Sequence, residues 1–307
     1  MKSYRIKHID AFTAEPFAGN FAAVVMDAAG LVDRQMQLIA REMNLSETAF
    51  ILPPTQQGAD LQIRWFTPSD EVPLCGHATI AAFHALAEEG MAGMKTLGQH
   101  YFRIQTRSGV LAVRVEKNFK GISVEMELPL PRFQTKRKIP QLLLESLTLG
   151  SWDVADDLPI VVDAYAYVPV KKLAKLKTLK PGFKLLAQAT RSAKVLGVSV
   201  FCLETIEKSS SVHSRFFAPG VGINEDPVTG SANGPLGVYL YQYAVPAGFV
   251  VQSRDLSDGR IEYVGEQGDE LEHPGRVKIR VRGKNNLAES VSIAGEAVTV
   301  LDAAIRL

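Results

Sequence analysis

A motif that recurs half a chain apart constrains the fold of this sequence more than any other feature. The segment RWFTP at residues 64–68 matches RFFAP at residues 215–219, and in both copies a phenylalanine stands 14 residues before the arginine. After a three-residue insertion in the second copy, PLCGHA at residues 73–78 matches PVTGSA at residues 227–232. So many matching residue types in the same order predict a chain built from two similar halves.

The repeat also predicts where the halves lie. A chain of 307 residues is long enough for two ordinary domains. We expect the first half to cover residues 1–118 and the second to cover residues 119–285, with Gly76 and Gly230 as equivalent positions. The final stretch, about residues 286–307, is expected to return to the first half.

Hydrophobic periodicity predicts the elements of each half. Alternation predicts strands over residues 4–13, 22–26, 48–52, 60–66, 101–106, 110–116, 121–127, 198–204 and 211–217. Helical spacing predicts helices over residues 33–43, 77–89, 139–147, 170–178, 183–195 and 231–243.

Composition limits the classes of partner and compartment. Lys plus Arg (34) nearly balances Asp plus Glu (33), which argues against nucleic acid as the main ligand. Two cysteines, Cys75 and Cys202, are too few for a disulfide scaffold and suit a reducing cytoplasm. The first residues have no signal-peptide pattern and no apolar stretch is long enough for a membrane span, so we expect a cytoplasmic protein without membrane contact.

Each copy of the repeat places a glycine turn where a helix begins. Free backbone N–H groups and the helix dipole favour an anion at such an end. Two ends of this kind, at Gly76 and Gly230, would make a cleft between the halves suited to a small carboxylate. The alternative is that both glycines only permit a tight turn.

Cys75, Gly76 and His77 raise the question of thiol or metal chemistry. The counterpart of Cys75 in the second half is Thr229, whose hydroxyl is far too weak an acid to serve as a base, so a pair of catalytic thiols is excluded. We therefore expect Cys75 to be a small packed side chain. Cys75, His77 and His84 lack further partners at ligand spacing, and no metal is expected. His77 is either an acid/base or an ordinary residue at a helix start.

The halves differ most informatively at Glu47. The alignment pairs Glu47 with the apolar Val198, and it gives Glu225 and Asp226 no clear counterpart. One carboxylate near a symmetric anion site suits proton transfer on a single face of a substrate. Such a glutamate works best with its pKa raised by burial. The alternative is a solvated glutamate beside Ser46.

Four motifs in this order, FAGN, NLSETAF, PLCGHAT and DPVTGSA, resemble those of the PhzF-like isomerases of phenazine biosynthesis, in the diaminopimelate epimerase-like superfamily. The resemblance implies an α+β fold of two pseudo-symmetric halves, each a curved, mostly antiparallel sheet around a central helix. It also implies an active site between the halves, no cofactor and a homodimer.

The resemblance also implies roles for particular residues. By motif, Glu47 matches the catalytic glutamate of the family, and His77, Asp226 and Ser231 match its other polar active-site residues. Substrate binding is expected at four residues, which are Asn20, Gly76, Gly230 and Ser231. In the phenazine enzyme the glutamate moves a proton within trans-2,3-dihydro-3-hydroxyanthranilate. Phe21 departs from the usual proline after Gly-Asn, which puts the turn beside Asn20 in doubt.

These observations favour a cofactor-independent isomerase that acts on a small carboxylate, with Glu47 as general acid/base and assistance from His77 and Asp226. Two alternatives stay open. One is a racemase or epimerase of an amino or hydroxy acid that uses no thiol pair. The other is a catalytically idle relative that binds a metabolite or a partner protein.

Overall fold

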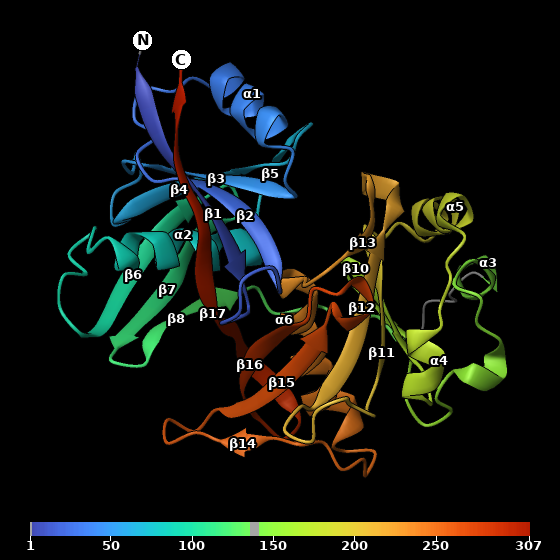
Figure 1. The fold of residues 1–307 in the computed structure, drawn as a ribbon. Coiled ribbons are helices and arrows are strands. Elements are labelled where there is room, and N and C mark those ends of the chain that lie inside the picture. The colour runs from blue at the N-terminus through green and yellow to red at the C-terminus, as the bar shows by residue number, and fades with distance from the viewer. Residues whose placement is uncertain (1, 136–140) are drawn as a thin grey trace. The chain divides into compact units, whose positions relative to one another are not determined.

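The computed structural model describes residues 2–135 and 141–307 of the chain (Figure 1). The described chain divides into two compact units, one made of Met1–Leu128 with Ser292–Leu307 and the other of Pro129–Val291. The first unit ends ten residues later than the predicted boundary at 118, because β8 (Gly121–Leu128) pairs with β7 (Gly109–Asn118). The expected return of the C-terminal segment is seen in β17 (Leu287–Arg306), which pairs along β1 (Ser3–Ala11).

The strands of the first unit close into a ring. The pairings run β1–β2–β3–β4–β6–β7–β8–β17 and return to β1. The remaining bounds are β2 Asn20–Val25, β3 Glu47–Leu52, β4 Leu61–Phe66, β5 Glu71–Val72 and β6 Gly98–Thr106. Pairs β2–β3 and β4–β6 are parallel. The sheet is therefore mixed, with mostly antiparallel pairs, and it closes on itself like a barrel, a closure that the expected curved, mostly antiparallel sheet did not include.

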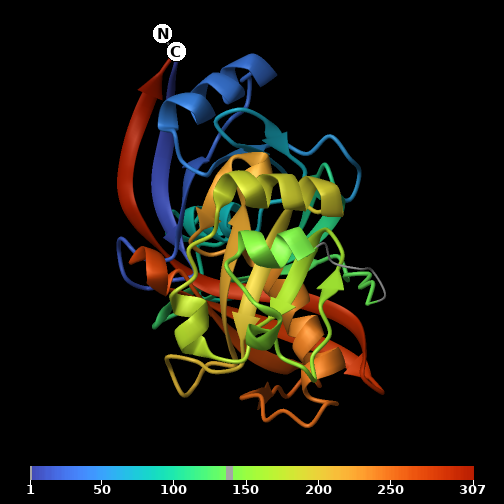
Figure 2. The ribbon, with the colours of Figure 1, turned by 90° about the vertical axis from the view of Figure 1, so that its right-hand side faces the viewer.

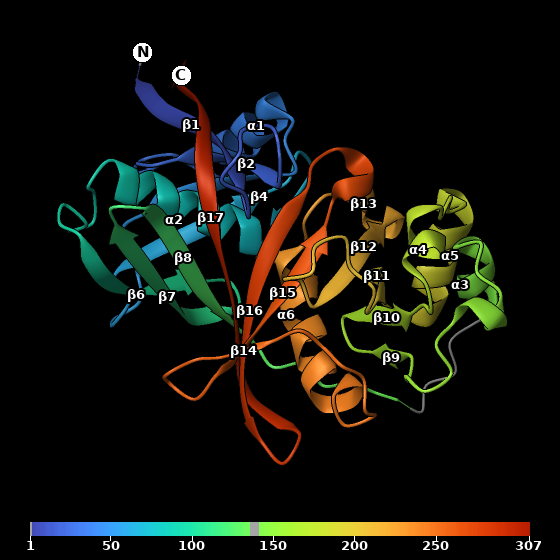
Figure 3. The same ribbon diagram turned by 60° about the horizontal axis from the view of Figure 1, so that its bottom comes forward.

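Helix α2 (Gly76–Glu88) packs against strands of this ring, as Figure 1 and Figure 3 show. Every residue from Gly76 to Ala87 is buried, and the sequence GHATIAAFHALA is apolar on nearly all sides. A helix without a polar face is stable only where protein surrounds it. This composition explains why α2 is central, whereas α1 (Asp33–Met43) buries one stripe, Met36, Ile39 and Ala40, against β3 and β4.

The second unit repeats this plan with additions. Strands pair in the order β9–β10–β11–β12–β15–β16, with β13 beside β12 and β14 beside β15. Their bounds are β9 Val161–Val162, β10 Tyr165–Pro169, β11 Gly197–Cys202, β12 Val212–Ala218, β13 Ile223–Asp226, β14 Arg254–Asp255, β15 Ile261–Gln267 and β16 Gly275–Lys284. Helix α6 (Gly230–Tyr239), which continues as a π-turn over Leu240–Ala244, packs against β15 and β16.

Three further helices cover the other face of the second sheet, as Figure 2 shows. They are α3 (Gln141–Ser146), α4 (Leu173–Lys177) and α5 (Phe183–Ala193). Short 3-10 turns lie at Ser151–Asp153, Pro219–Val221 and Asp269–Leu271. Residues 139 and 140 of the helix predicted over 139–147 lie outside the described residues.

Strand pairing confirms the repeat and corrects its alignment by one residue. Glu47 pairs with Ala22 at the start of β3, and Gly197 pairs with Tyr165 at the start of β11. Glu47 therefore corresponds to Gly197, and the predicted match with Val198 is wrong. The cause is one extra residue in the second hairpin, since Phe50 faces Arg64 but Val200 faces Arg215.

The two repeat arginines make equivalent ion pairs. Arg64 donates Nε and Nη2 to the carboxylate of Glu71, and Arg215 donates the same two atoms to Glu225, all at 2.7–2.8 Å. Glu225 thus has a counterpart in Glu71, contrary to the sequence alignment. Asp226 then corresponds to Val72, because each faces the residue after its arginine across a strand pair.

None of the helices within the described residues combines the length and apolar character that a membrane crossing requires.

Candidate active site

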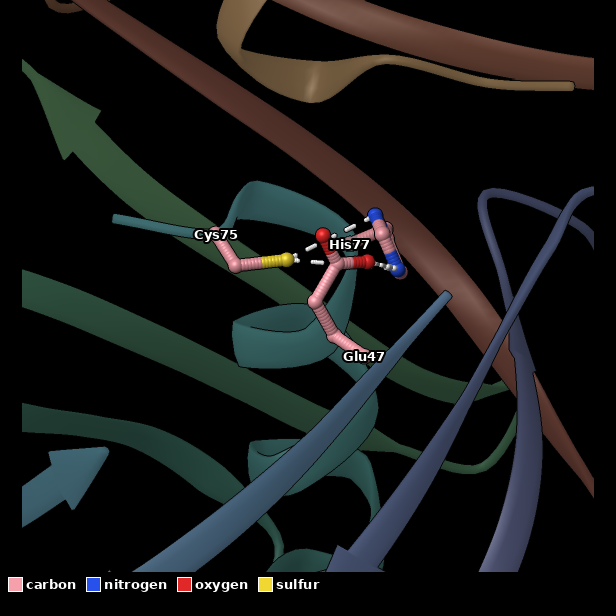
Figure 4. Close-up of side chains that lie close together, drawn as sticks. All are labelled: Glu47, Cys75 and His77. Carbon is pink, nitrogen blue, oxygen red and sulfur yellow. Dashed lines mark hydrogen bonds and ion pairs between the residues drawn. The ribbon is translucent and has the colours of Figure 1, made fainter. Parts of the chain in front are cut away.

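The first unit gathers polar side chains where β2, β3 and α2 begin. Asn20 is the first residue of β2, Glu47 is the first of β3, and His77 is the second of α2. Because β2 and β3 are parallel, their first residues lie at the same edge of the sheet. Figure 4 shows Glu47, His77 and the helix N-cap residue Cys75 pointing toward one another.

The FAGN turn that delivers Asn20 requires its glycine. Gly19 has a φ of +66°, and a Cβ there would lie 2.1 Å from the Ala11 carbonyl oxygen. Phe21, the departure from the family pattern, lies within β2 opposite Asp10. Its carbonyl oxygen accepts a hydrogen bond from Ser46 Oγ at 3.0 Å. Phe21 therefore supports the site through its backbone, next to Asn20.

His77 is at the centre of the cluster. Its Nε2 lies 3.1 Å from Glu47 Oε2 and 3.2 Å from Ser46 Oγ. Its Nδ1 lies 3.3 Å from Asn20 Nδ2 and 3.6 Å from Cys75 Sγ. Glu47 and His77 are only 8% and 5% exposed. The structure thus brings together the first-half residues predicted from sequence and adds Ser46 and Cys75 to them.

The charges of Glu47 and His77 depend on one another. Burial alone would raise the pKa of Glu47, but the charge of His77 and hydrogen bonds from His77, Ser46 and Cys75 outweigh burial and hold this pKa below its usual value. Burial alone would lower the pKa of His77, but Cys75 and Glu47 raise it well above its usual value. Both shifts favour an ion pair of Glu47 and His77, and the pKa of Glu47 moves down, opposite to the rise expected from burial.

One oxygen of Glu47 is poorly satisfied. Among the described residues, no donor is aligned for a hydrogen bond with the buried Oε2, although His77 Nε2 lies only 3.1 Å away. A buried carboxylate oxygen that lacks an aligned donor gains free energy by taking up a proton or a donor from a ligand. Glu47 Oε2 therefore meets His77 as an ion-pair partner and can accept a further donor.

The same three side chains offer donor atoms to a cation. One atom each of Glu47, Cys75 and His77 lies within 4.8 Å of the others. His84, considered with them from sequence, is not part of this group. Burial raises the pKa of the Cys75 thiol, so a metal would have to displace its proton before binding the sulfur.

The second unit carries the other predicted site residues. Asp226 ends β13 and accepts a hydrogen bond from Thr229 Oγ1. Gly230 and Ser231 open α6, and Ser231 Oγ lies 3.0 Å from the Tyr165 hydroxyl. Sequence reasoning did not identify Tyr165, because the strand that carries it was not predicted.

In the second unit, the position equivalent to Glu47 is Gly197, which has no room for a side chain. A Cβ on Gly197 would lie 2.6 Å from Phe216 Cζ and 2.9 Å from the Phe217 carbonyl oxygen. The Phe216 ring packs edge-on against Tyr165, with ring centroids 4.9 Å apart. The Phe216 ring and the Phe217 carbonyl thus occupy the position that holds a carboxylate in the first unit.

Comparison with known proteins gives concordant results. The family model described as phenazine biosynthesis-like protein matches residues 9–303. An uncharacterized isomerase of Clostridium acetobutylicum is 34% identical and covers 98% of this chain and 97% of its own length. A crystal structure of the Bacillus anthracis phenazine biosynthesis protein of the PhzF family aligns over 100% of both chains, with 31% identity and a TM-score of 0.84.

A more distant structure shares the fold alone. A hydroxyproline epimerase from Agrobacterium vitis aligns over 99% of this chain and 92% of its own, with 14% identity and a TM-score of 0.58. The two-unit, epimerase-like fold expected from the sequence motifs is therefore found among proteins of known structure.

Proposed function

This chain belongs to the phenazine biosynthesis-like protein family and is an isomerase, and we propose that it moves a proton within a small carboxylate substrate. Glu47 is the proposed general acid/base. The observation that carries this proposal is the buried carboxylate of Glu47, whose Oε2 lies 3.1 Å from Nε2 of the buried His77.

The chemistry follows from these two side chains. The Glu47 carboxylate takes a proton from a substrate carbon, so that the C–H bond breaks and its electron pair stays on the substrate as a delocalised carbanion. The glutamate is then neutral, while the charge on His77 remains to stabilise the negative charge on the substrate. Return of the same proton to a different atom completes the isomerisation without a cofactor.

The asymmetry of the repeat supports a single proton carrier. Gly197 stands where Glu47 would have its counterpart, and Phe216 leaves no room for a carboxyl group there. We propose that the proton leaves and returns through Glu47 alone. A racemase with acids on both faces would need a second proton carrier from another position.

The remaining assignments are part of the same proposal. We propose that Asp226 assists the reaction and that Asn20, Ser231 and the amides near Gly76 and Gly230 bind the substrate. Assembly as a homodimer and a cytoplasmic location stay predictions.

The proposal is tested by isotope exchange. Small unsaturated carboxylates, including trans-2,3-dihydro-3-hydroxyanthranilate, are incubated with the protein in deuterated water and followed by NMR. Glu47→Gln keeps the shape of the side chain but cannot carry a proton, so we expect a loss of roughly 10⁴-fold in rate with binding retained. Glu42→Gln, on the exposed face of α1, is the matched control.

Other outcomes separate the alternatives. Exchange at an undiminished rate in Glu47→Gln places the proton carrier elsewhere, with His77 the next residue to replace. Inversion at a stereocentre without movement of a double bond indicates a racemase. Line broadening of a ligand without any exchange indicates an idle, binding relative.

A further inference from the structure

Gln267, the last residue of β15, is a buried amide that makes four hydrogen bonds. Its Oε1 accepts from the Thr229 backbone N–H at 3.0 Å and from Asn233 Nδ2 at 2.8 Å. Its Nε2 donates to the Asp226 carbonyl oxygen at 2.8 Å and to Thr229 Oγ1 at 3.1 Å. One side chain therefore ties the end of β13 to the start of α6.

The orientation of this amide is fixed by atoms whose hydrogen-bonding roles cannot change. A backbone N–H only donates and a backbone carbonyl only accepts. The N–H of Thr229 requires Oε1 on its side, and the carbonyl of Asp226 requires Nε2 on the other. The amide cannot be flipped without breaking both bonds.

This orientation of the Gln267 amide determines which acceptor receives the hydrogen bond of the Thr229 hydroxyl. Thr229 Oγ1 accepts from Gln267 Nε2, so its single proton is available for a different partner. That partner is Asp226 Oδ2, which lies at short hydrogen-bonding distance from Thr229 Oγ1. Gln267 thus determines that Asp226 receives a hydrogen bond from Thr229.

The residues on both sides of Gln267 are themselves held in place. Glu266 is fully buried and accepts hydrogen bonds from the backbone N–H groups of Ile206 and Glu207. Gly268 has a φ of +90°, and a Cβ there would lie 2.7 Å from the Pro227 carbonyl oxygen. The turn after Gln267 therefore packs directly on the loop that carries Asp226.

This arrangement is specific to the second unit. The residues of the first unit that correspond to Thr229 and Asp226 are Cys75 and Val72, which offer neither a hydroxyl donor nor a carboxylate acceptor. The fold of a repeat unit therefore does not require this arrangement. It lies beside Asp226, which is proposed above to assist the reaction.

We propose that Gln267 is a positioning residue that directs the Thr229 hydroxyl toward Asp226 and so presents the Asp226 carboxylate in one fixed orientation as a hydrogen-bond acceptor. The link to catalysis rests on the role proposed above for Asp226. The orientation itself does not depend on any substrate and can be measured without one.

Two variants remove the donor in different ways. Thr229→Val deletes the hydroxyl and keeps the shape of the side chain. Gln267→Glu replaces Nε2 with an oxygen, so the Thr229 hydroxyl can turn from Asp226 to the new carboxylate. Thr229→Ser keeps both the hydroxyl and Gln267, and it is the matched control.

The first measurement follows the ¹³C carboxyl resonance of Asp226 as pH is lowered, in protein labelled at aspartate and assigned with Asp226→Asn. Loss of a donor to the ionised carboxylate should raise the titration midpoint by about one pH unit in Thr229→Val and in Gln267→Glu. Thr229→Ser should keep the native midpoint. Native midpoints in both of the first two variants would overturn the proposal, and Thr229→Val decides the question alone if Gln267→Glu does not fold.

The second measurement uses turnover of trans-2,3-dihydro-3-hydroxyanthranilate, or of whichever carboxylate exchanges in the screen. We expect Thr229→Val and Gln267→Glu to lower kcat/KM by a similar factor, and the double variant to be no worse than either one, because both remove the same hydrogen bond. Shifted midpoints with native turnover would uphold the positioning by Gln267 and overturn the role of Asp226. Additive losses would show that Gln267 acts by another route.

Discussion

Glu47 and His77 show how a neighbouring charge can reverse the effect of burial on a carboxyl group. Desolvation alone would favour the neutral form of both side chains, yet the pKa of Glu47 is lowered and that of His77 is raised, because opposite charges 3.1 Å apart stabilise one another. A substrate carboxylate placed near His77 would compete for that charge. Substrate binding would then weaken the stabilisation of the Glu47 carboxylate by His77. Glu47 would become a stronger base and accept a substrate proton more easily.

The role of Cys75 remains a prediction that substitution can test. We expect Cys75→Ala to keep most activity and to lower the free energy of unfolding by about 1 kcal/mol, as for a small buried truncation. Burial raises the pKa of both cysteine thiols, that of Cys202 to about 12, so alkylation at neutral pH should be slow. Turnover before and after iodoacetamide treatment is the measurement.

Cys202→Ala is the matched control for this experiment. Alkylation that abolishes activity in the native protein but not in Cys75→Ala would return thiol chemistry to the mechanism. Loss of activity in both would point to Cys202 or to a steric effect.

For single residues, the sequence predicted which side chains lie close together but not their protonation states. Motif order and the asymmetry between the halves led to Glu47, Asn20 and His77, which the fold does bring together. The sign of the pKa shift at Glu47 depends on the distance to the His77 ring, and no pattern in the sequence gives that distance. Glu47 was matched with Val198 and not with Gly197, because motif alignment does not detect one extra residue in a hairpin.

At the scale of elements, strongly patterned segments were predicted well. The helix over 33–43 is confirmed as α1, and the helix predicted over 77–89 is α2 shifted by one residue. The middle of the chain was predicted less well, since the helix over 170–178 is only Leu173–Lys177 and follows the unpredicted strand β10. β10 has buried residues on both faces, so it lacks the alternation that reveals a half-buried strand.

A buried ionic cluster joins three elements of the second unit. His213 of β12 places Nδ1 2.9 Å from Glu266 of β15 and Nε2 3.1 Å from Glu270 of the following turn. Burial alone would lower the pKa of His213, but these two carboxylates outweigh it and raise the pKa to about 9. The same imidazole, with the Ile206 and Glu207 amides, outweighs burial and lowers the pKa of Glu266 to about 2.

This cluster predicts how stability depends on pH. A raised histidine pKa stabilises the folded state fully below about 6.5, and this contribution is lost as pH rises through about 9. The loss is on the order of 3 kcal/mol, at up to about 1.4 kcal/mol per pH unit. Urea unfolding at several values between pH 6 and pH 9.5 measures it.

His213→Gln removes the group that titrates. We expect this variant to be less stable at pH 6 by roughly 3–5 kcal/mol, because two buried carboxylates lose their cation. The decline in stability between pH 6.5 and pH 9 should also disappear from it. His100→Gln, outside the cluster, is the control, and an unchanged decline in His213→Gln would contradict the assignment.

At the scale of the whole molecule, the repeat predicted two units, and the chain does cross between them twice. The predicted first boundary was ten residues early because β8 was assigned to the second half. Its alternation predicts a strand but not its partners, which are β7 and β17. Closure of the first sheet was likewise missed, because it depends on a strand from the far end of the chain.

The C-terminal strand closes the ring of the first unit. Residues 292–307 lie between β8 and β1 in the ring, and residues 2 and 307 exchange backbone hydrogen bonds at 2.9 and 3.0 Å. Residues 1–128 alone would leave two strand edges open and should aggregate. A permuted chain that runs from residue 292 to 307, then through a short Gly-Ser link to residues 1–128, restores both pairings and should fold as a monomeric unit.

Circular dichroism and cooperative urea unfolding of the two chains are the measurements. The permuted chain should unfold in one transition, and Glu47→Gln within it should change the pH response of His77 by removing its partner charge, which histidine NMR detects. If residues 1–128 fold as well as the permuted chain, β17 is dispensable and the ring is not what holds the first unit together. If neither folds, the first unit draws its stability from the remainder of the chain, and the Glu47–His77 pair exists only in the whole protein.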